Sequence, residues 1–327
     1  MHPAFSVIFL TTLIGAGQGL FIALFLTESL GILGMAPTQN GNFLALGTLA
    51  SLILLGLGLI ASFFHLGRPE RAWRTATKWR TSWLSREVIV LPAFMGVVFL
   101  YGLAHWLDFN PTLFTLPGDR AVLVTVALGT VGTLLALALF VSTAMIYAAV
   151  KFLQEWHSPL TVVNYTLLGA ASGFTLATAY AAWSGAQLLH VLASTAIALT
   201  LLGLVTRIAS LIRNARIKPK STLQTAIGIK HPRIVQKSQG FMGGSFNTRE
   251  FFHHKSEGFV RAVKWIFLIA AFAIPTILLA VSLLMTVDPT NVLIAAALIQ
   301  YLGLVAERWF FFAQANHPQN LYYQSVA

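Results

Sequence analysis

The sequence predicts an all-α integral membrane protein, an eight-transmembrane-helix bundle with both termini in the cytoplasm. Of its 327 residues, 57% are hydrophobic and only 9% are charged, against roughly 25% charged in ordinary soluble domains. Eight apolar runs are long enough to cross a bilayer, and the Lys and Arg residues gather on one side of those runs. We expect residues 1–327 to form a single membrane domain.

The apolar runs define the spans. A bilayer core about 30 Å thick needs about 20 apolar residues of helix. A helix satisfies its own backbone in lipid, an open sheet cannot, and the alternating strands of a membrane barrel are not seen. We predict transmembrane helices at residues 5–33, 43–64, 87–107, 121–152, 160–182, 186–212, 260–287 and 291–313.

The charge distribution predicts the orientation. An even number of spans places both termini on one side, together with the loops after the second, fourth and sixth helices. That side carries 20 of the 21 Lys and Arg residues, and Arg120 is the exception. The positive-inside rule makes this side the cytoplasm, so we expect a multi-pass protein of the inner (cytoplasmic) membrane.

Composition also limits which classes of partner and which kinds of metal site the chain can have. The net charge of +11 lies in loops between apolar runs, which favours anionic lipid and a docked protein over nucleic acid. The chain has no cysteine, which excludes thiolate zinc sites and cysteine-ligated iron–sulfur clusters. An electron carrier of that kind must come from another chain.

The first span carries a glycine-rich stretch around Gly17 and Gln18. Small residues at this spacing let a neighbouring helix approach closely, which is the structural interpretation of the glycines. Gln18 is different, because an amide in mid-membrane needs a partner, either another helix or a bound carbonyl. Glu28, near the far end of the same span, is expected to reach out to the periplasmic surface.

Residues 65–87, which we call the hinge segment, connect the second and third spans. Six basic residues and three tryptophans there are typical of a membrane–water interface, where such side chains anchor the protein or contact lipid phosphates. His65 closes one span and Glu87 opens the next, so each is either an interface anchor or a proton-handling group. Ser85 is expected to cap the third helix, with Glu87 in its first turn. The basic residues are Arg68, Arg71, Arg74, Lys78, Arg80 and Arg86.

Four further polar residues are candidates in the later spans. Asn164 and Tyr165 lie near the cytoplasmic end of the fifth span and are expected to line the same cavity as His65. His105 and His190 lie at equal depth on different helices, as the axial ligands of a b-type haem would. The simpler interpretation is two unrelated interface histidines, because equal depth does not bring helices together. We expect no other metal site.

Residues 213–258, which we call the docking segment, form the longest break between spans. A basic loop of this length either docks a partner subunit or covers the membrane surface as a flap. The last span ends with Glu307 and Arg308 followed by aromatic residues. An acidic–basic pair at a span end is expected to contact other helices, for example at the hinge segment.

Several of these features together resemble a known family. They are Gly17-Gln18, the run from Ile60 to Pro69 that contains His65-Leu66-Gly67, the Ser85-Arg86-Glu87 start of the third span, and Arg308 with its aromatic neighbours. This set is similar to the membrane anchor subunits of dimethyl sulfoxide reductases, a family close to the polysulfide-reductase and NrfD-like membrane subunits. The similarity covers the first hundred residues and the end of the chain best.

The resemblance implies an eight-helix subunit that reacts with quinone. In most members such a subunit has no cofactor of its own and holds a molybdopterin catalytic subunit and a four-cluster iron–sulfur subunit at the membrane. In the family, the residues at the positions of His65 and Glu87 are tied to quinol binding and proton transfer. Quinone reduction needs a proton donor near each carbonyl, which agrees with those residue types.

Two departures from the dimethyl sulfoxide reductase anchors point to a subgroup. The charge count places the hinge segment in the cytoplasm, and the docking segment is additional. Both features resemble the membrane subunits of cytoplasmic sulfite-oxidising enzymes, which pass electrons from a molybdenum subunit to ubiquinone. The resemblance therefore implies electron flow from sulfite to the quinone pool, with the partner subunits on the cytoplasmic side.

We therefore expect a subunit of an oxidoreductase complex that binds quinone, either ubiquinone or menaquinone, near the cytoplasmic ends of the first three helices. His65 would bond one quinone carbonyl, Glu87 would relay protons and Gln18 would orient the ring. Gly17, Asn164 and Tyr165 are candidate lining residues, and Arg68 and Arg71 would grip the partner. The alternatives are a dimethyl sulfoxide or polysulfide reductase anchor that oxidises quinol, a purely structural anchor, and a transporter, which would need interrupted helices around a midplane site.

Overall fold

The structure is a computed structural model that describes residues 1–116, 120–237 and 248–322. Within this part of the chain, eight helical spans are long and apolar enough to cross a membrane. The predicted all-α membrane fold is therefore confirmed. The spans are α1 (Phe5–Ile32), α2 (Gly41–Phe63), α3 (Trp83–Trp106), α4 (Val124–Ala148), α5 (Pro159–Trp183), α6 (Leu189–Ala215), α9 to α10 (Glu257–Ser282) and α11 (Thr290–Ala313).

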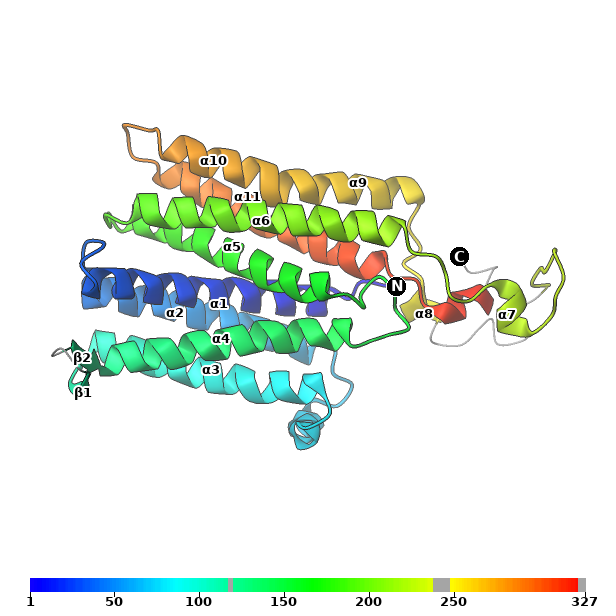
Figure 1. The fold of residues 1–327 in the computed structure, drawn as a ribbon, viewed down its shortest axis with the longest axis horizontal. Helices are drawn as coiled ribbons and strands as arrows, with labels where there is room; N and C mark the ends of the chain where they lie inside the picture. Colours follow the sequence, from blue (N-terminus) through cyan, green and yellow to red (C-terminus); the bar gives the residue numbers. More distant parts are fainter. Residues whose placement is uncertain (117–119, 238–247, 323–327) are drawn as a thin grey trace.

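The spans lie side by side in one bundle (Figure 1). Helices α2, α3 and α4 lie on one side of α1 and α5, and helices α6, α10 and α11 lie on the other. The central pair is the most enclosed, since 72% of the apolar window of α1 and 61% of that of α5 are buried. A polar side chain on α1 or α5 therefore faces protein rather than lipid.

Glycines bring α1 and α5 into close contact. A Cβ atom at Gly19 would lie 2.5 Å from the carbonyl oxygen of Gly169, and one at Gly173 would lie 2.2 Å from the backbone of Gly19. Only glycine fits at this distance, which confirms the packing role expected for the small residues of α1. The approach also sets the spacing between the polar side chains of the two helices.

The seventh span is the least regular. Its first part, α9 (Glu257–Leu268), passes through a π-helical turn, η2 (Ile269–Ala273), into α10 (Ile274–Ser282). The amide nitrogen of Gln300 on α11 donates to the carbonyl oxygen of Ala271 at 3.3 Å. This bond gives one carbonyl of the irregular turn a partner inside the bundle.

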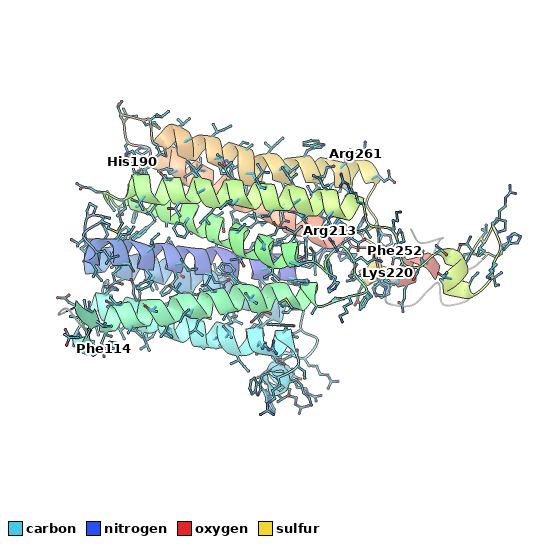
Figure 2. The ribbon with its side chains drawn as sticks, in the orientation of Figure 1. Phe114, His190, Arg213, Lys220, Phe252 and Arg261 are labelled. Atoms are coloured by element: carbon cyan, nitrogen blue, oxygen red, sulfur yellow. The ribbon has the colours of Figure 1, made fainter. Side chains whose placement is uncertain are left out.

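The start of the chain and residues 318–322, the last part that the structure describes, lie at one end of the bundle (Figure 1), which we call the terminal end. The Met1 ammonium donates to the carbonyl oxygens of Ala315 at 2.8 Å and Ala313 at 3.3 Å, so the start of the chain is tied to the end of α11. Arg213, Lys220 and Arg261 lie at the same end, whereas Phe114 and His190 lie at the opposite end (Figure 2). These three basic residues therefore lie at the same end as the start of the chain.

The hinge segment contains a 3-10 helix, η1 (Pro69–Lys78), before α3 begins. The helix α3 is capped by Ser82, whose hydroxyl oxygen accepts from the backbone nitrogen of Ser85 at 3.3 Å. The sequence-based assignment of the cap to Ser85 was wrong, because the chain turns into the helix three residues earlier than the apolar run suggests. Glu87 consequently lies about one turn inside α3.

Short elements complete the loops. The docking segment contains α7 (Leu223–Ile227) and α8 (Thr248–Phe251), and its residues 238–247 lie outside the described part. A final 3-10 turn, η3 (Pro318–Tyr322), follows α11. At the opposite end, β1 (Thr112–Leu116) and β2 (Arg120–Leu123) form an antiparallel hairpin. The sequence analysis expected no strands, and this pair is possible because it lies beyond the membrane-length helices.

Candidate functional site

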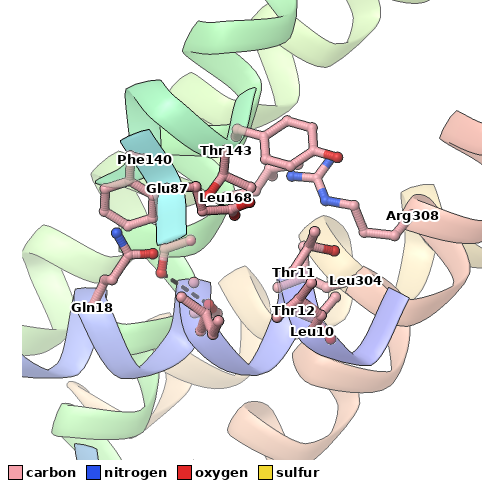
Figure 3. A pocket seen from close by; sticks show the side chains of 15 residues that line it. Leu10, Thr11, Thr12, Gln18, Glu87, Phe140, Thr143, Leu168, Leu304 and Arg308 are labelled. Atoms are coloured by element: carbon pink, nitrogen blue, oxygen red, sulfur yellow. Dashed lines mark hydrogen bonds between the residues drawn. The ribbon is translucent and has the colours of Figure 1, made fainter. Parts of the chain in front are cut away.

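A narrow pocket lies inside the bundle and is lined from α1, α3, α4, α5 and α11 (Figure 3). Its open space takes about one water molecule. Apolar side chains form much of its wall, and a few polar groups converge on it, as in many small-molecule sites. The polar lining residues are Thr11, Thr12, Gln18, Glu87, Thr143, Tyr165, Ser172 and Arg308.

Glu87 supplies a carboxylate to the pocket. Its position one turn inside α3 leaves it only 7% exposed, although it lies near the terminal end of the helix. The hydroxyl of Thr143 on α4 donates a hydrogen bond of 2.5 Å to its Oε1 atom. A carboxyl group held by one neutral donor, in a site that excludes bulk water, is suited to taking up and releasing a proton.

Gln18 places an amide in the same pocket. The residue is 2% exposed, and its Nε2 atom donates to the carbonyl oxygen of Ala136 on α4 at 2.8 Å. The hydrogen bond fixes the amide plane against α4. Its neighbour Gly17 faces α2 instead, where its carbonyl oxygen accepts from Ser51 and an added Cβ would lie 3.1 Å from Leu55. Gly17 therefore packs helices and does not line the pocket.

Tyr165 and Arg308 form the wall near α11. The guanidinium carbon of Arg308 lies 3.6 Å from the centre of the Tyr165 ring. This is a close cation–π contact, in which the ring partly replaces the water that an arginine would otherwise bind. The side chains of Gln18 and Arg308 lie on opposite sides of the pocket (Figure 3). Tyr165 thus lines one pocket with Gln18 and Glu87, and not with His65 as the sequence suggested.

Arg308 belongs to a buried ionic group. Its Nη1 atom lies 3.0 Å from Oε2 of Glu307, and Oε1 of Glu307 lies 2.7 Å from Nε of Arg207 on α6. None of the three residues is more than 4% exposed. The pair was expected to contact other helices, and Glu307 does contact Arg207 on α6, whereas the hinge segment, which was given as the example, is not its partner. The pair turns inward because a charge at this depth needs a partner, and Arg207 provides it.

The remaining predicted residues of the hinge segment lie outside the pocket. His65, Arg68 and Arg71 are all exposed, beyond the end of α2 and on η1, and none of them lines the cavity. Arg71 makes an exposed ion pair with Glu70 at 3.7 Å. The sequence placed His65 and Glu87 at the two ends of one site, but the structure brings only Glu87 into the bundle.

Asn164 is also separate from the pocket, although it is buried on α5. Its Oδ1 atom accepts a hydrogen bond of 2.8 Å from Thr206 on α6. This bond joins two neighbouring helices and leaves Asn164 a packing role, whereas the next residue, Tyr165, points to the cavity. The expectation that the two adjacent residues share one cavity was wrong, because successive residues of a helix face different directions.

A second polar cluster lies at the opposite end of the bundle. Glu28 accepts hydrogen bonds from Tyr101 at 2.7 Å and Thr125 at 2.5 Å, and Nε2 of His105 lies 3.5 Å from its Oε1. Glu28 is 9% exposed, so the expectation that it reaches out to the surface was wrong. It stays inside because α3 and α4 offer it three polar partners.

The two histidines considered as haem ligands do not meet. His105 turns inward to Glu28, whereas His190 is exposed at the start of α6. Their helices lie on different sides of the central pair α1 and α5 (Figure 1). Equal depth in the sequence therefore reflects two unrelated positions. Within the described residues, no group of three or more His, Asp and Glu side chains could hold a metal ion.

No site role was predicted for Arg207 or Thr143, and Arg308 was named only in the family resemblance and in the Glu307–Arg308 pair. Arg207 and Arg308 carried a usable signal, because an ionisable residue inside an apolar span marks a functional position by default. Thr143 carried none, since its span contains other hydroxyl residues and only the fold selects the one that faces Glu87.

Comparisons with known proteins agree over the whole chain. The family model described as DMSO reductase anchor subunit (DmsC) matches residues 1–313. The chain is also 57% identical over 327 residues to a protein of Allochromatium vinosum that is named as a subunit of sulfite dehydrogenase, and the match covers 100% of both chains.

Proposed function

The chain belongs to the family of DMSO reductase anchor subunits, and from this premise we propose that it exchanges electrons and protons with a membrane quinone in the pocket around Glu87. Membership in the family makes it a membrane subunit of an oxidoreductase complex. A lipid-soluble quinone is the electron carrier that reaches a pocket between transmembrane helices. The chain itself is the quinone-reacting subunit in this proposal.

One observation carries the proposal. The buried carboxyl group of Glu87, bonded to Thr143, lines the same cavity as the amide of Gln18. Reduction of a quinone to a quinol takes up two electrons and two protons, and each proton goes to a carbonyl oxygen. A carboxyl group at the cavity wall can deliver such a proton and take another from water at the terminal end. Gln18 can hold the ring in place.

The pocket must widen to admit the ring. Its open space takes about one water molecule, so a quinone headgroup enters when lining side chains such as Phe140 and Leu168 move apart. Those two residues are apolar, and rotating an apolar side chain breaks no hydrogen bond. The polar residues keep their bonds to Ala136 and Thr143 meanwhile.

Electrons must come from a partner, because the chain has no cysteine to ligate an iron–sulfur cluster. We propose that a four-cluster iron–sulfur subunit, which connects to a molybdopterin catalytic subunit, docks at the terminal end. The docking segment there carries exposed cations, among them Lys218 and Lys220, and the hinge segment carries Arg68 and Arg71. By the positive-inside rule this end faces the cytoplasm, and the membrane is the inner membrane.

The name of the Allochromatium vinosum relative supports a substrate for the complex and a direction of electron flow. That protein is named as part of a sulfite dehydrogenase, so we propose that the complex oxidises sulfite and reduces ubiquinone or menaquinone. Oxidation of sulfite to sulfate releases two electrons, which is the number that one quinone accepts. The description of the family model supports a second candidate, in which a reductase partner draws electrons from quinol. Glu87 would then accept protons from the quinol.

Binding of a quinone analogue to the purified complex tests the proposal. A hydroxyquinoline N-oxide resembles a quinol headgroup and changes its fluorescence on binding. Wild-type complex should bind it at one site per anchor, and Glu87→Gln should weaken binding. Glu70→Gln is the matched control, because Glu70 is an exposed carboxylate of the same segment. Absence of saturable binding to the wild-type complex would leave a purely structural anchor.

A further inference from the structure

The buried ionic group of α6 and α11 carries a charge that its own members do not balance. Arg207 is 1% exposed, Glu307 is 0% exposed and Arg308 is 4% exposed. Two guanidinium groups share one carboxylate, so the group has one positive charge in excess. An uncompensated charge inside a membrane bundle is costly, and such groups face a ligand, a partner or a water-filled cavity.

Only one of the two arginines, Arg308, can contact a ligand in the pocket. Arg207 is enclosed, with the rings of Phe267 and Phe310 at 5.4 Å and 5.8 Å from its guanidinium carbon, and it does not line the pocket. Arg308 does line the pocket. Among the described residues, Glu307 is its one ionic or hydrogen-bonding partner. The other nitrogen atoms of Arg308 are therefore available to a ligand in the cavity.

Tyr165 adds a second donor at the same place. Its ring lies against the guanidinium of Arg308, and its hydroxyl is buried beside Tyr147, whose ring stacks on that of Tyr165 at 5.6 Å, without a well-formed hydrogen bond to any described residue. Buried donors are almost always paired in folded proteins. Arg308 lies across the cavity from Gln18 (Figure 3), and Tyr165 lies against Arg308, so two donors are found on the α11 side of the cavity.

We propose that Arg308, assisted by Tyr165, binds the quinone oxygen that becomes negatively charged during reduction, across the pocket from Gln18. Arg207 and Glu307 are positioning residues, because they hold Arg308 in place without touching the cavity. This inference rests on the proposed function and adds the anion-binding side of the same site. The planar guanidinium group of Arg308, a fork of N–H donors, would bind the headgroup through the arrangement of those donors as well as through its positive charge.

The chemistry balances with the residues already named. A partner iron–sulfur cluster passes two electrons to the quinone one at a time, and water at the terminal end supplies the two protons, one of them through Glu87. Arg308 keeps its proton throughout, since a guanidinium does not deprotonate in proteins. Its part is to stabilise negative charge on the oxygen until the proton arrives, which is how fixed donors lower barriers in closed sites.

Binding of the hydroxyquinoline N-oxide to the full complex, followed by fluorescence, tests this role without relying on turnover. We expect Arg308→Gln to raise the dissociation constant by about tenfold or more, because it removes charged hydrogen bonds. Arg308→Lys should raise it by about threefold, since lysine keeps the charge and loses the fork. Arg261→Gln, at an exposed position of α9, is the matched control and should bind as wild type.

If Glu307 acts by positioning Arg308, its replacement should change the affinity for the analogue but not the amount of assembled complex. Glu307→Gln should weaken analogue binding several-fold while the complex stays assembled, because Arg308 then loses its anchor. A merely structural role for the ionic group would lower the amount of assembled complex and leave the dissociation constant of the assembled fraction unchanged. That second pattern would overturn the inference.

The outcomes also separate this inference from the proposed function. If Glu87→Gln weakens analogue binding and both Arg308 variants bind within about twofold of wild type, the anion-binding role of Arg308 is wrong and the quinone site stands. If wild-type complex does not bind the analogue, both the quinone site and the role of Arg308 are wrong. Should Arg308→Gln fail to assemble, Arg308→Lys decides, because it retains the buried charge, and wild-type affinity in that variant would contradict the role of the fork.

Discussion

The hydroxyl of Thr143 on α4 donates a 2.5 Å hydrogen bond to the carboxylate of Glu87 on α3. This contact places Glu87 inside the helix bundle although the sequence assigns it to the edge of a basic loop. It also joins two helices that line the candidate pocket. The proposed proton path to the quinone therefore begins at a carboxyl group whose orientation α4 determines.

Removing this hydroxyl should impair quinone turnover. Thr143→Val leaves the buried carboxyl group without its donor, a loss of about 1–3 kcal/mol for an unsatisfied buried group. We expect an assembled complex with several-fold slower quinone reduction in a steady-state assay. Ser142→Ala is the matched control, because the hydroxyl of Ser142 bonds only to its own helix at Ala138. Equal rates in both variants would remove Thr143 from the mechanism.

Close packing of α1 against α5 should be sensitive to a single methyl group. At Gly173 an added Cβ would lie 2.2 Å from the backbone of Gly19, so Gly173→Ala must push the central helices apart. We expect a loss of about 1–3 kcal/mol, as for other overpacked cores, measured by thermal unfolding in detergent. Gly96→Ala should have no such effect, because a Cβ there meets nothing within 4 Å. Similar midpoints for both variants would contradict the packing.

Charge reversal in the docking segment should loosen the partner. Lys220 is exposed at the terminal end, and Lys220→Glu replaces attraction to an acidic partner by repulsion. We expect less iron–sulfur subunit to remain with the anchor after purification at low salt, and a smaller difference from wild type at high salt, because salt screens both the attraction and the repulsion. Lys151→Glu makes the same change at an exposed site outside both segments. Full retention of the partner by the Lys220 variant would argue against docking there.

The N-terminus should give the protein a defined pH dependence. Burial lowers the pKa of the Met1 amino group from 8.0 to about 6, and the nearby Glu155 only partly opposes this. The unfolded chain therefore binds more protons than the folded one between pH 6 and pH 8, so stability should rise with pH across this window, by on the order of 1 kcal/mol.

A short Gly-Ser extension ahead of Met1 provides the control for that measurement. It moves the amino group into water and breaks its bonds to Ala313 and Ala315. We expect the thermal unfolding midpoint of wild type to rise, relative to that of the extended variant, as the pH is raised from about 6 to about 8. Parallel pH profiles for the two proteins would show that the amino group is not held as the structure shows.

Much of the fold could be predicted from the sequence because the bilayer imposes its thickness on the chain. The fifth span was expected at 160–182 and is found at Pro159–Trp183. The seventh was expected at 260–287, and α9 to α10 spans Glu257–Ser282. Apolar length alone sets such limits. The length of an apolar run does not predict the π-helical turn η2, which depends on contacts with α11.

The site was predictable only in part. Gln18 was recognised as an amide in mid-membrane, Glu87 and Tyr165 were candidates near the cytoplasmic ends of their spans, and the three residues do line one pocket. His65 was grouped with Glu87 because it is close in sequence, whereas burial separates them. The Arg207–Glu307 contact joins residues far apart in the chain, and no spacing rule applies to a pair on different helices. Such pairings are determined by how the helices pack.

Quinone reduction by the complex with Glu87→Gln is the sharpest test of the proposed proton donor, because the variant keeps the shape of the side chain and removes its proton. We expect an assembled complex whose rate of quinone reduction is at least about tenfold below wild type, while Glu70→Gln behaves as wild type. An assembled Glu87→Gln complex that reduces quinone as fast as wild type would show that Glu87 does not carry the proton.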